Sequence, residues 1–352
     1  MKVLKLTTLL DFGGQEKQYL SVTEKPELLN HQYVFAALGF GGNAEKELKK
    51  RGFEVYILNR NFSIRNLSNI WAVYRLIKKI KPDVVHTAAA EANFHGIIAA
   101  KLAGVKTIIG EEIGIPNHSG IAKRIFRWVY QLTDNVICVS ASVKNHLVAT
   151  REIREEKGVV IYNPVSVPKV LPLIENKRFR IVYIGRLEKV KNVASLIKAF
   201  AKLSDDIIEL ILVGDGREKE SLENLVTDLK ISDKVYFKGF CSEPSKYLCS
   251  ADLFVLPSYS EGFGIAAVEA MFLKVPVLAT NIGGVHEFIT DGQTGWLFNP
   301  NDPEELKKKL EEIIKSKILK KVGWKGYESA VNTFSIENYV KDLENFYLLT
   351  HG

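Results

Sequence analysis

The chain has 352 residues, of which 46% are hydrophobic and 25% are charged, as is ordinary for a soluble globular protein. This length exceeds one typical hydrophobic core, so we expect two domains. No apolar run approaches the roughly 18–20 residues that cross a bilayer, and the first residues resemble a β-strand more than a signal peptide. Cys138, Cys241 and Cys249 lack the paired short spacings of a disulfide framework or a zinc site. These features predict a cytoplasmic protein.

The formal net charge of +7 is unevenly distributed. Residues 1–165 hold 23 Lys and Arg against 15 Asp and Glu, a net of +8, so the remainder is close to neutral. The basic half therefore predicts an anionic contact. Nucleic acid, a membrane surface and a phosphorylated substrate are all compatible with the charge alone.

Short β-branched runs alternate with amphipathic helical stretches along the whole chain. The strands predicted in the first half are 2–10, 32–38, 54–57, 83–87, 106–109, 135–139 and 158–161, with helices at 67–80 and 93–103 among them. The strands predicted in the second half are 180–184, 207–213, 234–237, 253–256 and 275–279. Such alternation is typical of α/β domains in which helices cover both faces of a parallel sheet.

The two halves meet near Tyr162 to Val165, and a stretch rich in Pro and Lys, 166–177, follows as a predicted linker. We predict an N-terminal domain at 1–165, a C-terminal domain at 166–334 and a final helix at 335–352 that packs back toward the N-terminal domain. Doubly wound sheets bind ligands at the carboxyl ends of their strands. Two such domains would face each other across a deep cleft.

The strongest candidate site is the segment 258–270, which follows a predicted strand and opens a helix. The free N–H groups and the dipole of a helix start form an anion site, and Gly262 and Gly264 let a ligand approach the backbone. Glu261 can accept hydrogen bonds from sugar hydroxyls, and Glu269, about two turns further on, suits a ribose diol. The alternative is an ordinary strand–loop–helix corner with an N-terminal Glu.

Two further loops could hold phosphate. In 184–192, Arg186 offers a planar fork and Lys191 a compact charge to a diphosphate, unless this is simply a solvated basic turn. The loop 11–15 carries Gly13 and Gly14 but not the full dinucleotide fingerprint, which disfavours an NAD enzyme. A similar partial match at 213–216 is better explained as a tight turn.

The ordered motifs GRLEKVKN, LILVGDG, FKGF, ADLFVLPSYSEGFGIAAVEAM and PVLATNIGGVHEFITDGQTGWLF resemble the family 4 (group 1) retaining glycosyltransferases. The resemblance is strong over about 178–318 and weaker in the first half, in FGGQEK and VSASVKNHL. It implies a GT-B fold, with two facing Rossmann-like domains, and a nucleotide-sugar donor as substrate. It also implies that no metal is required, and no Asp-x-Asp motif occurs to hold one.

The resemblance assigns roles to individual positions. Arg186 and Lys191, beside Gly185, match the residues that bind the donor diphosphate. Glu269 matches the ribose ligand. The segment that holds the transferred sugar is matched by Glu261, Gly262, Phe263 and Gly264, the base-contacting turn by 239–241 with Phe240, and the N-domain loop that closes over phosphate by Gly13 and Gly14.

The N-terminal half departs from the family pattern. Many relatives place a His after the strand that corresponds to 106–109, whereas this chain has Glu111 and Glu112. Either carboxylate could take over recognition of a sugar hydroxyl, and we include Glu111 among the candidate catalytic residues. His86, at the end of a strand, is a further candidate, although a lone His there is as often structural. His95 and His118 are weaker candidates.

Two basic amphipathic stretches, 64–81 and 120–131, suggest contact with an anionic bilayer. The second carries Lys123, Arg124 and Arg127 near Trp128. The alternative for both is a core-facing apolar stripe with a solvated basic back.

These observations predict a retaining enzyme that moves a hexose from a UDP- or GDP-linked sugar to a glycan or lipid-linked acceptor, in surface polysaccharide or glycolipid synthesis at the inner face of the cell membrane. One rival is a GT-B isomerase that binds the same donor and transfers nothing. Another is a basic nucleic-acid-binding protein, although no aromatic–basic RNA signature is present and we expect no nucleic acid partner.

Overall fold

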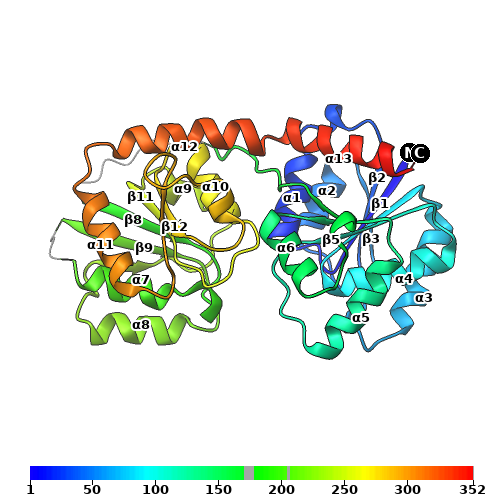
Figure 1. Ribbon diagram of the computed structural model, residues 1–352, viewed down its shortest axis with the longest axis horizontal. Helices are drawn as coiled ribbons and strands as arrows, with labels where there is room; N and C mark the ends of the chain where they lie inside the picture. The colour runs from blue at the N-terminus through cyan, green and yellow to red at the C-terminus, as the bar shows by residue number, and fades with distance from the viewer. Residues whose placement is uncertain (170–177, 204–206, 352) are drawn as a thin grey trace. The chain divides into compact units, whose positions relative to one another are not determined.

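The computed structural model describes residues 1–169, 178–203 and 207–351 (Figure 1). The chain divides into two compact units, Met1–Val165 with Phe334–Gly352 and Ser166–Thr333. Each unit is a parallel sheet with helices packed against it. The predicted linker at 166–177 lies largely outside the described residues.

The sheet of the first unit has the order β3-β2-β1-β4-β5-β6-β7. Every pairing in it is parallel, and β1 lies at the centre between β2 and β4. Its strands are β1 (Lys2–Thr7), β2 (Gln32–Ala37), β3 (Glu54–Ile57), β4 (Val84–Ala88), β5 (Thr107–Glu112), β6 (Asn135–Cys138) and β7 (Gly158–Val160). Because β1, β4 and β5 are covered on both faces, their side chains are almost all buried, charged ones included.

Several α-helices of the described residues belong to this unit. They are α1 (Gly14–Val22), α2 (Asn43–Lys50), α3 (Ser68–Ile80), α4 (Ala90–Ala103), α5 (Gly120–Gln131), α6 (Ala141–Ala149) and α13 (Ile336–His351). Helix α3 ends where Lys81 adopts a left-handed conformation before Pro82, and α4 ends at Gly104, also left-handed. Both ends follow from residues that cannot continue a helix.

The last helix, α13, is part of the core of this unit. Ile336, Tyr339, Leu343 and Tyr347 are buried with the side chains of β1 and β2. The Glu344 carboxylate accepts hydrogen bonds from the backbone N and the side-chain Nδ2 of Asn30, at 2.9 and 2.7 Å. The end of the chain is therefore fixed to the N-terminal sheet by apolar packing and by charge-assisted hydrogen bonds.

The second unit has a six-stranded parallel sheet in the order β10-β9-β8-β11-β12-β13. Its strands are β8 (Phe179–Ile184), β9 (Ile208–Val213), β10 (Val235–Phe237), β11 (Leu253–Leu256), β12 (Val277–Thr280) and β13 (Trp296–Phe298). Its helices are α7 (Val193–Ala201), α8 (Lys219–Asp228), α9 (Ser245–Leu248), α10 (Ile265–Phe272), α11 (Pro303–Ile314) and α12 (Leu319–Phe334). The loops after β8 to β12 all leave from the carboxyl edge of this sheet.

Three local features differ from the sequence prediction. β5 runs to Glu112, so Glu111 and Glu112 are strand residues rather than part of a following loop. The three-residue strand β13 was not predicted. His86 lies in the middle of β4, not at its end.

Candidate functional site

The loop after β8 is held against the loop after β9. The Tyr183 hydroxyl donates to the Arg186 carbonyl at 2.9 Å, and the Gly185 N–H donates to the Val213 carbonyl at 3.0 Å. Gly214 has φ 143°, and a Cβ there would lie 1.9 Å from the Gly185 carbonyl oxygen. This close approach permits only Gly, so 213–216 has the role of a tight turn that supports the Arg186 loop.

The same loop joins the one after β11. Lys191 Nζ lies 2.7 Å from Glu261 Oε2, and their side chains are only 17% and 13% exposed. Asn192, left-handed at φ 53°, starts α7 and donates from Nδ2 to the Pro257 carbonyl at 3.1 Å. The Tyr259 N–H donates to the Val190 carbonyl at 2.8 Å. The structure thus brings two separately predicted motifs into one cluster.

Glu261 is further held by residues that the sequence analysis did not single out. The fully buried Ser258 hydroxyl donates to Glu261 Oε2 at 3.3 Å. The Gly284 N–H donates to the Glu261 carbonyl at 3.1 Å, and a Cβ on Gly283, whose φ is 64°, would lie 1.9 Å from that carbonyl oxygen. Gly283 and Gly284 follow β12, and the loops after neighbouring parallel strands meet at the same edge of a sheet. This Gly-Gly pair was therefore the sequence signal for a contact with the Glu261 loop.

The remaining donor-site candidates lie on the same edge. Gly264 has φ 96° and precedes the first turn of α10, while Glu269 is half-buried within that helix. The Phe263 ring is buried and packs against Phe288, with ring centroids 5.8 Å apart. Only its backbone can therefore border a ligand. Gly262 is half-buried beside them.

The turn after β10 presents an aromatic ring. Gly239 is left-handed, and its carbonyl accepts a hydrogen bond from the Gly214 N–H at 2.9 Å. Phe240, the next residue, is 61% exposed. An exposed ring beside backbone groups suits stacking on a planar base.

In the first unit, Gly13 and Gly14 are exposed at the start of α1. Glu16, in the first turn, is buried, and burial raises its pKa. A Cβ on Gly13 would meet Glu16 Oε2 at 2.4 Å. A side chain at Gly13 would therefore displace Glu16, whose negative charge is favourable at a helix start.

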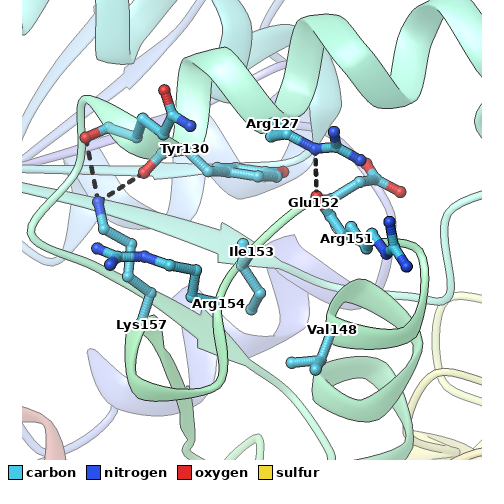
Figure 2. Close-up of a pocket in the computed structure, with 9 residues that line it drawn as sticks. Arg127, Tyr130, Val148, Arg151, Glu152, Ile153, Arg154 and Lys157 are labelled. Carbon is cyan, nitrogen blue, oxygen red and sulfur yellow. Dashed lines mark hydrogen bonds between the residues drawn. The ribbon is translucent and has the colours of Figure 1, made fainter.

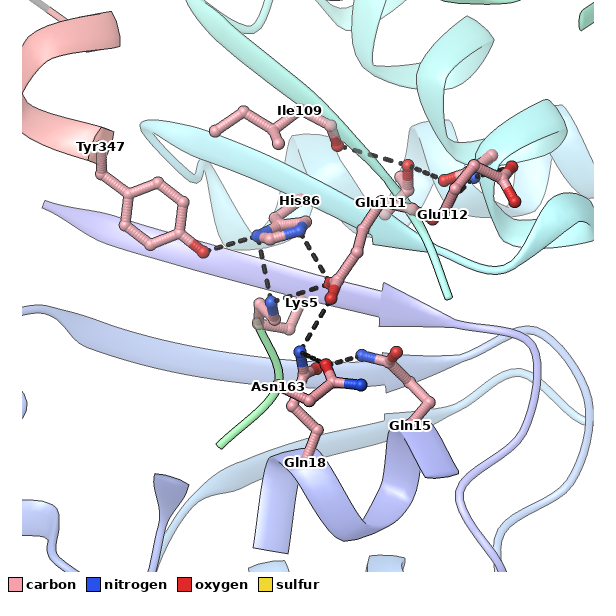
Figure 3. A network of polar contacts seen from close by, with 11 residues as sticks. Lys5, Gln15, Gln18, His86, Ile109, Glu111, Glu112, Asn163 and Tyr347 are labelled. Atoms are coloured by element: carbon pink, nitrogen blue, oxygen red, sulfur yellow. Dashed lines mark hydrogen bonds and ion pairs between the residues drawn. The ribbon is translucent and has the colours of Figure 1, made fainter. Parts of the chain in front are cut away.

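His86 and Glu111 lie side by side in a fully buried polar network (Figure 3). His86 Nε2 lies 3.0 Å from Glu111 Oε2, and Lys5 Nζ lies 3.0 Å from His86 Nδ1 and 3.5 Å from Glu111 Oε2. The Tyr347 hydroxyl of α13 is 2.6 Å from His86 Nδ1. Gln18 Nε2 donates to Glu111 Oε1 at 2.7 Å and to Asn163 Oδ1 at 2.9 Å.

The charges in this network balance. Burial raises the pKa of Glu111, but the Lys5 ammonium and His86 outweigh it and lower that pKa to about 2. Burial and the Lys5 charge lower the pKa of His86 to about 4, so its ring is neutral at neutral pH. With both side chains fully buried against internal partners, the structure places neither at the surface. Their catalytic roles stay predictions.

A second buried cluster surrounds Glu112. The Tyr130 hydroxyl donates to Glu112 Oε1, and Asn93 Nδ2 donates to the same oxygen at 3.1 Å. Burial raises the pKa of Glu112 to about 7. His118, stacked on Phe126, lies 2.7 Å from Glu152 Oε2.

His95 is a core residue. Its side chain is fully buried, and Nε2 lies 3.2 Å from the Ser63 carbonyl oxygen. Burial lowers its pKa. This environment suits a structural neutral imidazole.

Within the described residues, no three His, Cys, Asp or Glu side chains are grouped so as to hold a metal ion. In the same part of the chain, none of the helices has the length and apolar character needed to cross a membrane.

Comparison with known proteins matches both halves of the chain. Residues 171–327 match the family described as glycosyl transferases group 1, and residues 12–168 match glycosyltransferase family 4. The Escherichia coli UDP-Gal:alpha-D-GlcNAc-diphosphoundecaprenol alpha-1,3-galactosyltransferase is 28% identical over 85% of this chain and 84% of its own length. The Staphylococcus aureus capsular polysaccharide biosynthesis glycosyltransferase CapM is 25% identical over 86% and 87%. The solved structure of Anabaena HepE in complex with UDP has a TM-score of 0.85 at 21% identity and covers 99% of both chains.

Proposed function

From the premise that the chain belongs to the family 4 group 1 glycosyltransferases and has their GT-B fold, we propose that it is a retaining hexosyltransferase. It takes a hexose from a nucleoside diphosphate sugar and passes it to an acceptor hydroxyl. The observation that carries this proposal is the Lys191–Glu261 pair. It supports the proposal because it brings the cation proposed to bind phosphate and the carboxylate proposed to bind the sugar together on the carboxyl edge of one parallel sheet.

The proposed donor site follows this edge from one loop to the next. Arg186 and Lys191 bind the diphosphate, the Arg186 guanidinium in a bidentate manner. The start of α10 at Gly264 adds N–H groups and its dipole. Glu269 accepts from the ribose hydroxyls, Phe240 borders the base, and Glu261 accepts from the hydroxyls of the transferred sugar.

In the proposed reaction, the acceptor oxygen forms a bond to the anomeric carbon as the bond from that carbon to the diphosphate oxygen breaks. The attack comes from the face that the diphosphate leaves, so the configuration is retained. The acceptor proton passes to the departing diphosphate. Arg186 and Lys191 stabilise the negative charge that develops on it, so catalysis is mainly electrostatic and positional and requires no metal ion.

The relatives support a UDP-linked donor and a lipid-linked or glycan acceptor. The Escherichia coli relative is named for a UDP-galactose donor and a diphosphoundecaprenol acceptor, and HepE was solved with UDP. We propose that this chain acts in surface polysaccharide or glycolipid synthesis at the cytoplasmic face of the membrane.

Helix α5 supports peripheral membrane contact. Its Phe126 and Val129 are buried in the core, so they take no part in a membrane surface. Ile121 and Trp128 are 74% and 52% exposed beside Lys123, Arg124 and Arg127. An exposed Trp with basic neighbours suits the interface of an anionic bilayer.

A donor screen tests the proposal first. Nucleotide sugars with different bases and hexoses are compared by thermal shift, because a ligand that binds only the folded state raises its stability. The stabilising donor is then incubated with and without acceptor, and the product's anomeric configuration is read by NMR. Transfer with inversion would contradict the retaining mechanism. Conversion of the donor into an isomeric nucleotide sugar, without acceptor-dependent release of nucleoside diphosphate, would favour the isomerase.

A further inference from the structure

A cavity of about 330 Å³ lies in the first unit, and none of the candidate site residues lines it. Figure 2 shows Arg127 and Arg151 on one side of it, Arg154 and Lys157 on the other, and Ile153 between them. This volume is at the lower end of the range for small-molecule sites. The cavity therefore fits a small ligand or one end of a larger one.

Its lining is strongly cationic. Three guanidinium groups and one ammonium group meet a single carboxylate, that of Glu152. That carboxylate is fully buried and engaged elsewhere, with Oε2 2.7 Å from His118 Nδ1 and Oε1 accepting from the Thr150 hydroxyl at 2.9 Å. Glu152 thus leaves the cationic character of the cavity largely uncompensated.

Arg127 and Lys157 are held in place by backbone carbonyl groups. Arg151 is left-handed at φ 58° just after α6, and its carbonyl accepts a hydrogen bond from Arg127 Nε at 2.5 Å. Lys157 Nζ donates to the carbonyls of Tyr130 and Gln131, at 2.9 and 3.1 Å, at the end of α5. Lys157 therefore closes the helix end. The Arg side chains remain as the donors for a ligand.

The guanidinium groups of Arg127, Arg151 and Arg154 have few carboxylate partners that would compete with a bound anion. Arg154 Nε has a surface contact with Glu156 at 3.1 Å, with both side chains more than half exposed, which is a weak pairing. Within residues 1–169, 178–203 and 207–351, neither Arg127 nor Arg151 has a carboxylate partner. Planar guanidinium groups with few acidic partners match the geometry and charge of phosphate.

We propose that this cavity is an anion site that binds a phosphate group, as a phosphomonoester or diphosphate, separately from the donor site. Arg127, Arg151 and Arg154 donate to the phosphate oxygens, and Ile153 and Val148 contact the group that carries it. The phosphate comes from a soluble metabolite or from a lipid headgroup, and the two arms of the test below distinguish these sources.

The first arm uses inorganic diphosphate and hydrogen–deuterium exchange of the full chain. We expect dose-dependent protection of peptides within 147–158. The double variant Arg151→Gln/Arg154→Gln should need at least about tenfold more diphosphate, because a hydrogen bond to a charged group contributes at least that factor. Peptides within 184–192 report binding at the donor loops separately, so the failure of either site is visible by itself.

The second arm uses vesicles that contain phosphatidic acid, a phosphomonoester, or phosphatidylglycerol at matched surface charge. A lipid source predicts tighter binding to phosphatidic acid, lost in the double variant. The matched control is Lys320→Gln/Lys321→Gln, which removes the same charge from exposed positions of the other unit. Unchanged thermal unfolding establishes that each variant is folded.

The proposal is supported if binding of diphosphate or of phosphatidic acid vesicles depends on Arg151 and Arg154 and is unchanged in the control variant. The ligand that shows this dependence identifies the source of the phosphate group. Should the double variant and the control behave alike in both arms, the cavity is an ordinary basic surface and the proposal is overturned. Arg151→Lys separates the contribution of charge from that of geometry. The variant keeps the positive charge but lacks the planar guanidinium group, so it should keep only part of the affinity for the phosphate group.

Discussion

Lys191 Nζ and Glu261 Oε2 lie 2.7 Å apart although 70 residues separate them in the chain. One follows β8 and the other follows β11, and these two strands are neighbours in the sheet. The pair is mostly shielded from water, so each charge depends on the other. A donor diphosphate that binds Lys191 would draw it from Glu261 and leave the carboxylate to accept from the sugar.

We expect Glu261→Gln to lower turnover by about 10- to 100-fold, the factor that corresponds to losing a hydrogen bond with a charged partner. Gln keeps the size of the side chain and can still accept from Ser258, so the fold should persist. The measurement is kcat with the donor found by screening. Glu223→Gln, on the exposed face of α8, is the control. Equal turnover of the two variants would refute the role of Glu261.

Arg186→Ala and Lys191→Ala should each lower kcat by roughly 10²–10³, as for loss of one donor to a developing negative charge. Both act on one diphosphate, so the double variant should lose less than the product of the two factors. Steady-state kinetics of the three variants test this, with the exposed Arg217→Ala as a control. Fully multiplicative losses would mean that the two residues serve different groups.

Lys191→Ala also leaves Glu261 without its ammonium partner. Part of its effect could therefore arise through Glu261. Lys191→Ala combined with Glu261→Gln separates the contributions, because removing both charges relieves the unpaired carboxylate. If the combined variant is more stable than Lys191→Ala alone, the pair matters for the fold as well as for the donor.

The parallel sheets were predictable because their strands are short, β-branched and separated by helical patterns. Predicted and observed bounds of β2, β3 and β11 are close, and the end of α3 is marked by Pro82. The extension of β5 to Glu112 was not predictable from residue type, because glutamates are rare inside a buried strand. Lys5, His86 and Gln18, from three other elements, make the burial of Glu111 tolerable. Tyr130 and Asn93 do the same for Glu112.

The loops after β8 and β11 were predictable as motifs, but their contacts with each other were not. Sequence spacing indicated that Lys191 and Glu261 follow strands, and parallel pairing of β8 with β11 brings them together. The support of Glu261 by Ser258 and Gly284 depends on the path of the loop after β12. No local pattern encodes that path.

We expect activity to survive excess chelator. Arg186, Lys191 and the start of α10 supply the positive charge that a divalent ion provides in other phosphate-transfer sites. The assay compares initial rates with and without EDTA at saturating donor. Complete loss that Mg²⁺ or Mn²⁺ restores would overturn metal independence and would leave the family assignment intact.

Binding to anionic vesicles should depend on α5. Each basic residue near such a surface is worth about 1 kcal/mol, so replacing Lys123, Arg124 and Arg127 with Gln should weaken partitioning by about two decades. The effect should fade as salt screens the charges. Co-sedimentation at low salt measures it. The control is the triple Gln variant of Lys320, Lys321 and Lys325, which are exposed positions of the other unit. Wild-type protein that stays in the supernatant would refute membrane contact.

Glu112 should make stability depend on pH in the opposite sense to a salt-bridged carboxylate. Burial raises its pKa from 4.5 to about 7 despite the Tyr130 and Asn93 hydrogen bonds. Between these values the folded chain binds the proton that the unfolded chain releases, so stability falls as pH rises from 4.5 to about 7 and levels off above. At 1.36 kcal/mol per pKa unit the loss is about 3 kcal/mol.

Glu112→Gln removes this titration while its amide oxygen can still accept from Tyr130. The variant's advantage in unfolding free energy should therefore grow by about 2–3 kcal/mol between about pH 5 and about pH 8. Urea unfolding at the two pH values measures it, with Glu24→Gln as the control because that side chain is exposed. A difference that stays constant with pH would show that Glu112 is ionised throughout, with its burial compensated by His118 and Asn93 more strongly than the geometry indicates.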